Sequence, residues 1–337
     1  MLSFARMDPE VAREAYELGS DARDWKVTLA QQDLLDSGPD RDRVVPILYR
    51  PFDVRYTYYS GRSRGFICMP RVQVMHQMLA GQNVALVTAR TNKSPVMDHF
   101  LCSDGIVETK CGESTVQSYT FPLYLYPDTQ RADLFSALQP QGRRPNLHPQ
   151  VLAALAAAYG QPPTPEQVFH YMYAVVYAPA YREKYADFLR LDFPRIPFAS
   201  DAGLFEALAA LGEELAALHL LRSPALNPPS CRYEGQGNSR VGKNEGDGFY
   251  YDAVAERVPI NGTQYFAPLP LEVWQYTIGG YQVCEKWLKD RKGRELSLDE
   301  IRTYCCIVTA LRQTIEIQEE IDGLYAGVEG TPLSLRL

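Results

Sequence analysis

The segment from residue 49 to residue 71, YRPFDVRYTYYSGRSRGFICMPR, constrains the fold more than any other stretch of the chain. It contains two runs rich in aromatic and β-branched residues, 54–59 and 65–69, joined by Ser-Gly-Arg-Ser-Arg. Such runs favour strands, and the Gly and Ser between them favour a turn. The pattern predicts a β-hairpin that carries Arg62 and Arg64 at its tip.

The tip of such a hairpin has two possible roles. Guanidinium groups on a stiff base suit contact with phosphate or with the edge of guanine, and arginines interleaved with aromatics are typical of nucleic-acid-binding surfaces. An exposed pair of arginines is as often only solvated. From these residues alone the two interpretations are evenly balanced.

The predicted fold class is α+β. Strands are expected mainly between residues 44 and 127, with short connections that favour an antiparallel or mixed sheet. Helical periodicity dominates the remainder and ends in a long C-terminal helix that begins after Ser297. Shifts in composition divide the chain into a helical segment 1–43, a β-rich lobe 44–127, a linker and helical segment 128–222, a second short β-rich and loop-rich segment 223–270, and a C-terminal helical segment 271–337.

The individual elements follow from local patterns. Strands are predicted at 44–49, 54–59, 65–69, 83–88, 99–103, 106–111 and 119–126, and again at 249–251, 257–260 and 264–266. Helices are predicted at 8–16, 25–35, 71–79, 150–159, 164–178, 180–191, 202–221, 283–290 and 298–325.

Charge and composition limit the classes of function. The net charge of −7 argues against a nucleic-acid binder when it is taken over the whole chain. However, cations outnumber anions between residues 41 and 110, whereas residues 298–329 are rich in Asp and Glu. A basic face on an acidic body is therefore possible. No apolar run has the length of a membrane span and no signal core is present, which predicts a cytoplasmic protein with no membrane partner.

No complete catalytic motif can be identified. The stretch NPPS at 227–230 lacks the aromatic residue of an amino-methyltransferase motif, and GNSRVGKN at 237–244 lacks the Ser or Thr of a phosphate-binding loop. Neither the histidines nor the cysteines have the spacing of a metal site. Asp98, Glu108 and Lys110 loosely resemble a metal-dependent nuclease, although charged strand ends explain them better. Another alternative to DNA binding is a protein-interaction module that docks through the C-terminal helix.

Several stretches together resemble the C-terminal specificity region of Type ISP restriction–modification enzymes and of related single-chain adenine methyltransferases. The resemblance spans nearly the whole chain. It is carried by residues 24–35 (DWKVTLAQQDLL), 46–71 with RPFDVRYTYYSGRSRGF, 121–127 (FPLYLYP), 169–198, 272–288 (EVWQYTIGGYQVCEKWL) and 296–322.

The resemblance implies a target recognition domain that binds double-stranded DNA. In this family a nuclease, a helicase-like motor and an adenine-N6 methyltransferase precede that domain in one polypeptide. Residues 1–43 would then connect to the methyltransferase domain, which is the implied protein partner and would bind S-adenosylmethionine. No cofactor, metal or catalytic residue is expected in this chain, and it would direct methylation and cleavage performed elsewhere.

Candidate DNA contacts are chosen by charge and by their place on strand ends and loops. Such a domain docks with phosphate contacts and reads base edges with a few polar side chains. The β-rich lobe offers Arg62, Arg64, Arg71, Arg90, Asn92, Lys93, Lys110 and Gln117, and the later loop-rich segment offers Arg240, Lys243 and Asn244.

Overall fold

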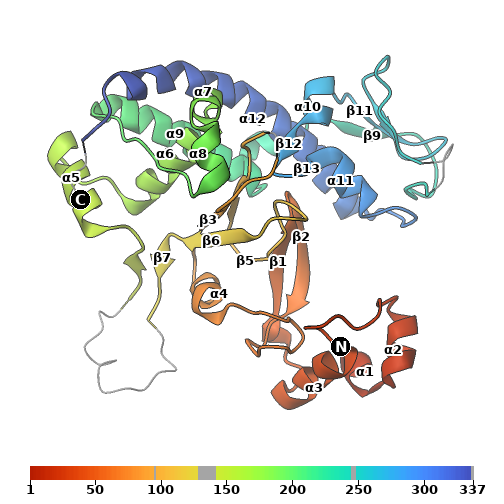
Figure 1. The fold of residues 1–337 in the computed structure, drawn as a ribbon. Coiled ribbons are helices and arrows are strands. Elements are labelled where there is room, and N and C mark those ends of the chain that lie inside the picture. Colours follow the sequence, from red (N-terminus) through yellow and green to blue (C-terminus); the bar gives the residue numbers. More distant parts are fainter. Residues whose placement is uncertain (95, 128–141, 244–247, 335–337) are drawn as a thin grey trace, which may run out of the picture.

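The structure is a computed structural model that describes residues 1–94, 96–127, 142–243 and 248–334 (Figure 1). The predicted α+β class is confirmed, because small sheets lie beneath a layer of helices that includes a long C-terminal helix. Within the described residues, no helix is both long enough and apolar enough to cross a membrane.

The N-terminal helices form a small unit with a core of their own. They are α1 (Leu2–Arg6), α2 (Pro9–Ala15) and α3 (Val27–Ser37), of which the last two were predicted. Phe4, Val27 and Leu34 pack in this core together with Tyr58, which comes from the end of a strand. Figure 1 shows the unit at the lower right, apart from the helical layer.

The first sheet is mixed and has the strand order β2-β1-β5. β1 (Val44–Arg50) pairs antiparallel with β2 (Asp53–Tyr58) and parallel with β5 (Ile106–Val107). A tight turn at Pro51 and Phe52 joins β1 to β2, and Phe52 takes a positive φ of 59° there. This pair of strands is called the β1–β2 hairpin below.

The predicted hairpin between residues 54–59 and 65–69 is therefore wrong. β2 pairs with the strand before it, and the residues of the second run form no strand. The physical reason lies in Asp33 of α3. Its Oδ2 accepts hydrogen bonds from the Phe66 amide at 2.8 Å and the Ser60 hydroxyl at 2.7 Å, so this segment is held against a helix.

The β1–β2 hairpin joins the two cores of the protein. At its open end Tyr58 belongs to the core of the N-terminal unit. At its turn Leu48 and Phe52 belong to the main core, which contains the other sheets and the helical layer. The hairpin thus connects the N-terminal helices to the rest of the molecule by packing in both cores.

A second sheet is antiparallel, with the order β4-β3-β6. It contains β3 (Ala85–Ala89), β4 (Phe100–Ser103) and β6 (Ser118–Pro122), with α4 (Val72–Leu79) in the connection before β3. The strand predicted at 119–126 is split in two, because β7 (Tyr124–Leu125) turns away to pair with β8 (Arg144–Pro145). The strand predicted at 106–111 ends at Val107.

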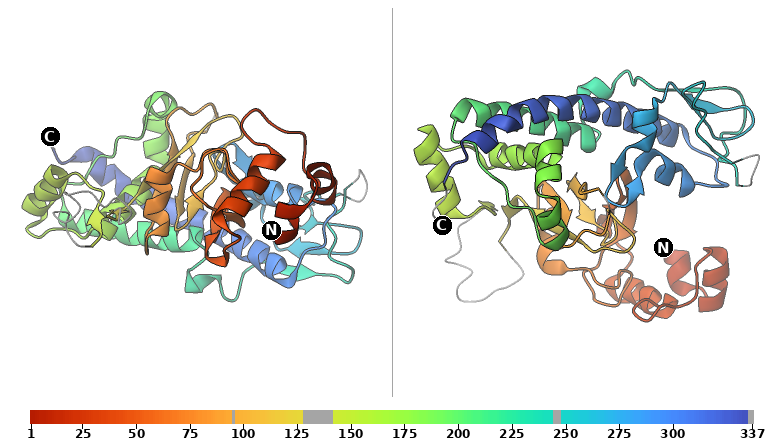
Figure 2. Two further views of the ribbon diagram at one scale, coloured as in Figure 1. Left: turned by 90° about the horizontal axis from the view of Figure 1, so that it is seen from below. Right: turned by 45° about the horizontal axis from the view of Figure 1, so that its top comes forward.

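The helical layer closes over these sheets. It is built from α6 (Pro165–Tyr177), α9 (Ala202–His219) and the long α12 (Leu298–Gly330), which lie side by side in both figures (Figures 1 and 2). Capping boxes at Thr164–Gln167 and Ser297–Glu300 start α6 and α12 as the sequence predicts. Three shorter helices surround them: α5 (Pro149–Tyr159), α7 (Pro179–Lys184) and α8 (Ala186–Leu191).

A close approach between two helices of this layer depends on a glycine. A Cβ atom on Gly212 of α9 would overlap the carbonyl oxygen of His170 on α6. Gly212→Ala is expected to destabilise the protein by about 1–3 kcal/mol, because two packed helices would have to separate. Urea unfolding of Gly212→Ala and of Gly323→Ala, which has open space around it, compares the two changes. Equal stability of both variants would contradict this packing.

The later β-rich segment has three strands, as predicted, but only the last two are at the predicted positions. β9 (Arg232–Glu234), β10 (Val258–Pro259) and β11 (Tyr265–Ala267) form a sheet of order β10-β11-β9. The strand predicted at 249–251 is absent. α10 (Leu271–Gln275), a two-strand turn of β12 (Thr277–Ile278) and β13 (Tyr281–Gln282), and α11 (Val283–Lys289) then lead toward α12.

Candidate nucleic-acid interface

A dense group of cations lies at the end of α11. Residues 286–294 read KWLKDRKGR, with five cations and one anion. Residues 289–294, which we call the basic loop, expose the side chains of Lys289, Lys292 and Arg294. None of these residues was among the predicted DNA contacts, although a short Lys- and Arg-rich run is itself a signal for nucleic-acid contact.

The basic loop lies against the segment that contains the predicted residues Arg240 and Lys243. The Val241 amide donates to the Arg294 carbonyl at 2.9 Å, and the Gly293 amide donates to the Val241 carbonyl at 2.6 Å. Arg240 and Lys243 are both exposed, and Arg240 reaches Glu295 at 3.3 Å. Two segments about 50 residues apart thus place their cations on one surface. The third predicted residue here, Asn244, lies outside the described residues.

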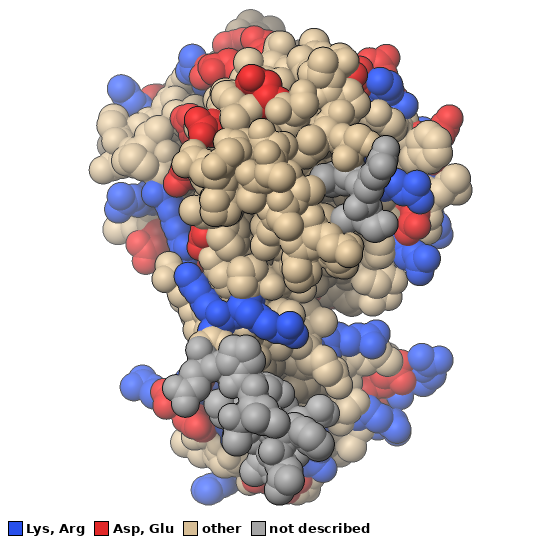
Figure 3. Space-filling model, turned by 90° about the vertical axis from the view of Figure 1, so that its left-hand side faces the viewer, with Lys and Arg blue, Asp and Glu red and all other residues tan. Residues whose placement is uncertain are grey.

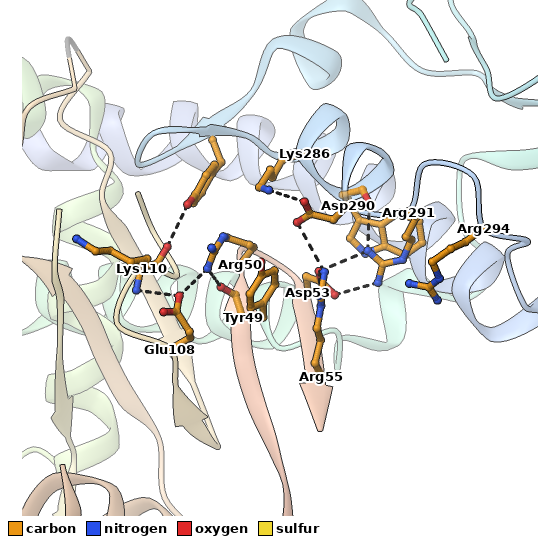
Figure 4. Close-up of polar contacts among 12 residues, drawn as sticks. Tyr49, Arg50, Asp53, Arg55, Glu108, Lys110, Lys286, Asp290, Arg291 and Arg294 are labelled. Atoms are coloured by element: carbon orange, nitrogen blue, oxygen red, sulfur yellow. Dashed lines mark hydrogen bonds and ion pairs between the residues drawn. The ribbon is translucent and has the colours of Figure 1, made fainter. Parts of the chain in front are cut away.

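An ion-pair cluster joins the basic loop to the β1–β2 hairpin (Figure 4). Arg291 donates from Nη2 to Asp53 Oδ1 at 2.9 Å. It also donates from Nε to Glu300 Oε1 at 3.0 Å. Only 8% of the Arg291 side chain and 1% of the Asp53 side chain are exposed. We call this group the Asp53–Arg291–Glu300 clamp. Burial alone would raise the pKa of Asp53, but hydrogen bonds from Arg291 and Arg55 hold it below its usual value.

A second layer of charges continues the cluster across the sheet. Tyr49 has the guanidinium groups of both Arg50 and Arg55 near its ring, at 3.9 and 3.8 Å from the centroid. Arg50 pairs with Glu108 at 2.6 Å, and Arg55 lies 2.8 Å from Asp53. Stacking and pairing fix both guanidinium planes. Figure 4 shows these side chains between the strands and α11.

The outer edge of β2 is open in the described part of the chain, because β1 is its only strand partner there. Two large side chains project from this strand. Val54 is 56% exposed and Tyr56 is 76% exposed. The unpaired edge of β2 and these two side chains are therefore accessible to a partner.

Three of the predicted DNA contacts lie near the open end of the β1–β2 hairpin, away from the clamp. Arg62, Arg64 and Arg71 are exposed, and their segment packs against α3. Arg62 forms an ion pair with Asp36, which lowers the pKa of that carboxyl group. These residues follow β2 in an irregular segment and do not form a hairpin tip.

Three other predicted residues lie beside α8. Arg90 pairs with Asp192 at 3.2 Å, and Lys93 is exposed. Asn92 is buried, and its Oδ1 accepts from the Ser94 amide at 2.9 Å. This asparagine stabilises a turn, so its side chain is not presented for reading a base.

Lys110 and Gln117 lie on either side of the turn that precedes β6. Gln117 is exposed and Lys110 is half-buried. The Lys110 carbonyl accepts from the Tyr281 hydroxyl at 3.2 Å, which ties this turn to β13 near the ion-pair cluster. In Figure 4 the Lys110 ammonium group points away from the rest of the cluster.

The geometry does not favour the nuclease alternative. Asp98 is buried, its Oδ2 accepts from the Thr277 hydroxyl, and burial raises its pKa. Glu108 is engaged by Arg50 and by the Lys110 amide. Among the described residues, no group of three His, Cys, Asp or Glu side chains is arranged to hold a metal ion.

Comparison with protein families decides the classification. The family described as the Type ISP C-terminal specificity domain matches residues 1–320. The chain belongs to this family. No curated protein matches the chain at a significant level.

Solved structures of two Type ISP enzymes and of DrdV share the fold of this specificity domain. In "cryoEM structure DrdV-DNA complex" the match has 22% identity and a TM-score of 0.67, and covers 94% of this chain and 32% of that chain. For the Type ISP enzyme LlaBIII bound to DNA, the identity is 18% and the TM-score 0.65, and the match covers 94% of this chain and 21% of that chain. For a nuclease-deletion mutant of the Type ISP enzyme LlaGI with a DNA substrate mimic, the identity is 19% and the TM-score 0.57, and the match covers 84% of this chain and 25% of that chain. The specificity domain thus spans a third or less of each.

Charge alone does not select one face of the specificity domain. Figure 3 shows a band of Lys and Arg at the waist of the face opposite to the N-terminal helices, below a largely uncharged upper part. Arg143 and Arg144 are among the exposed cations next to residues 128–141. Unlike these residues, the basic loop is tied by buried ion pairs to a second surface element, the β1–β2 hairpin.

Proposed function

We propose that this chain recognises a short sequence in double-stranded DNA as the target recognition domain of a restriction–modification enzyme. Membership of the Type ISP specificity family over residues 1–320 carries the proposal. The exposed cations of the basic loop and of Arg240 and Lys243 support it, because phosphate contacts position such a domain on a duplex. The three similar solved structures are all complexes with DNA or a DNA substrate mimic.

The proposal assigns different roles to the surface elements. The basic loop, with Arg240 and Lys243, holds phosphates, and the open edge of β2 approaches the bases with Arg55 and Tyr56. Arg62, Arg64 and Arg71 provide further phosphate contacts at the other end of the hairpin. Local positive charge of this kind allows binding by a chain whose net charge is −7.

The catalytic steps belong to other domains in this proposal. The companion is an adenine-N6 methyltransferase domain of the same polypeptide, which would bind S-adenosylmethionine and reach this chain through residues 1–43. The C-terminal helix is not assigned to a partner, since Tyr304, Leu311, Ile321 and Tyr325 of α12 are buried in the core. No observation supports the interaction-module alternative over DNA recognition.

Lys289→Ala combined with Lys292→Ala is expected to weaken binding to any duplex. If each lysine holds one phosphate, the slope of log K against log salt falls by about 2. Fluorescence anisotropy with a labelled duplex between low and physiological salt measures this slope. Arg62 already pairs with Asp36, so Arg62→Ala with Arg64→Ala is expected to reduce the slope less.

The matched control is Arg312→Ala. Arg312 is 53% exposed and pairs with Glu316 on α12, about 20 Å along the helix from its start. This variant should bind as the unchanged chain does. An unchanged slope in the double lysine variant would remove the basic loop from the interface.

A further inference from the structure

We propose that the Asp53–Arg291–Glu300 clamp is a positioning device for sequence discrimination. It sets the spacing between the two elements that contact DNA, so it controls which sequence is read more than how strongly DNA is bound. This inference rests on the proposed function. It assigns Arg291 and Asp53 the role of positioning residues that do not themselves touch DNA.

The clamp connects the two contact elements directly. Asp53 is the first residue of β2, two residues before Arg55 and three before the exposed Tyr56. Arg291 lies inside the basic loop, between Lys289 and Lys292. A shift of the clamp by an ångström would therefore move the edge of β2 relative to the basic loop.

The guanidinium group of Arg291 is held from several directions. Besides its bonds to Asp53 and Glu300, Nη1 donates to the Trp287 carbonyl at 3.1 Å, and Cζ lies 3.5 Å from the centre of the Trp287 ring. Only a planar group with several donors can satisfy these contacts together. Lysine keeps the charge but loses this geometry.

Glu300, the third residue of the clamp, lies in the first turn of α12. Oε2 of Glu300 accepts from the Ser297 amide at 3.1 Å in the capping box, while Oε1 receives Arg291 and Arg294, each at 3.0 Å. The start of α12 is thus fixed by the same carboxylate that receives Arg291. The basic loop is therefore held rigidly against the helical layer.

Rigid spacing matters more for reading bases than for holding phosphates. Phosphate attraction is long-ranged and independent of sequence, so it tolerates a small displacement. Hydrogen bonds to base edges need donor–acceptor distances within a few tenths of an ångström. Loosening the clamp therefore lowers discrimination and leaves most of the non-specific affinity.

The experiment compares Arg291→Lys with the unchanged chain. Duplexes selected by the unchanged chain from a randomised pool define the target, and a scrambled duplex of equal composition is the reference. The ratio of the two Kd values is expected to fall tenfold or more in Arg291→Lys. Its affinity for the scrambled duplex and its salt slope should change little. Lys289→Ala with Lys292→Ala should weaken both duplexes and keep the ratio.

Each outcome decides a separate question. A folded Arg291→Lys variant that keeps the ratio overturns the positioning role. If this variant does not fold, Asp53→Asn combined with Arg291→Met provides the same test, because it removes the clamp without leaving a buried charge unpaired. Failure of the unchanged chain to select or bind any duplex would instead contradict the proposed function.

Discussion

Replacing Arg291 with alanine is expected to lower the free energy of unfolding by about 3–5 kcal/mol, because it leaves a buried carboxylate without its partner. Of its counter-ions in the described part of the chain, Asp53 would lose the more buried one and keep Arg55, whose side chain is 39% exposed. Glu300 would lose one of its two arginines. Chemical denaturation at neutral pH, followed by circular dichroism, measures the change.

A matched surface variant separates this effect from general loss of charge. Arg312→Ala removes an exposed pair on α12 and should change stability by less than about 0.5 kcal/mol. Asp53→Asn combined with Arg291→Met removes both buried charges and should cost less than Arg291→Ala alone. If Arg291→Ala were as stable as Arg312→Ala, Asp53 would have to find another counter-ion.

Acidification from pH 7 to pH 4.5 is expected to destabilise the protein, and buried histidines are the main reason. Burial lowers the pKa of His219 to about 3 and that of His99 to about 4. In the unfolded chain both bind a proton near pH 6.5. The unfolded state therefore binds more protons as the pH falls below 6.5, and stability decreases until the folded pKa values are reached.

The hydrogen bonds of His219 explain why it stays neutral. Thr314 donates its hydroxyl hydrogen to the Ala310 carbonyl at 2.7 Å, so it accepts from His219 Nε2 at 2.9 Å. Nδ1 is then an acceptor for the Tyr173 hydroxyl at 2.6 Å. A second proton on the ring would break the bond with Tyr173 inside the core.

The two histidines together are expected to cost about 4 kcal/mol between pH 6.5 and 4.5. Asp98 acts in the opposite direction, since burial raises its pKa and the folded state binds its proton more readily. Urea titrations at pH 7 and 4.5 measure the net loss. His219→Gln should be less stable at pH 7 but lose less on acidification, and an identical loss in both proteins would argue against this origin.

Much of the fold could be predicted because its signals are local. Caps at Thr164 and Ser297 fix where two long helices begin, and runs of β-branched, aromatic and other apolar residues mark β1, β3 and β6. The pairing of β2 was predicted wrongly because two neighbouring runs competed for it. The choice depends on Asp33, which lies some 30 residues away in α3 and gives no local signal.

The candidate interface was only partly visible in the sequence. Arg240 and Lys243 were chosen for charge, and the structure adds the basic loop beside them through backbone pairing. Asn92 was chosen for its amide, yet tertiary packing buries it. The clamp could not be foreseen, because Asp53 and Arg291 are 238 positions apart and ordinary charged residues in the sequence.

The length of the β1–β2 hairpin fixes the distance between two groups of cations. β1 has seven residues, and at about 3.3 Å per residue it measures roughly 20 Å from end to end. The basic loop is fixed at one end and the segment with Arg62 and Arg64 at the other. Since base pairs of B-DNA are stacked about 3.4 Å apart, the two groups of cations would fall roughly six steps apart along a duplex. Under the proposed function, the edge of β2 then lies along the bases between the two groups.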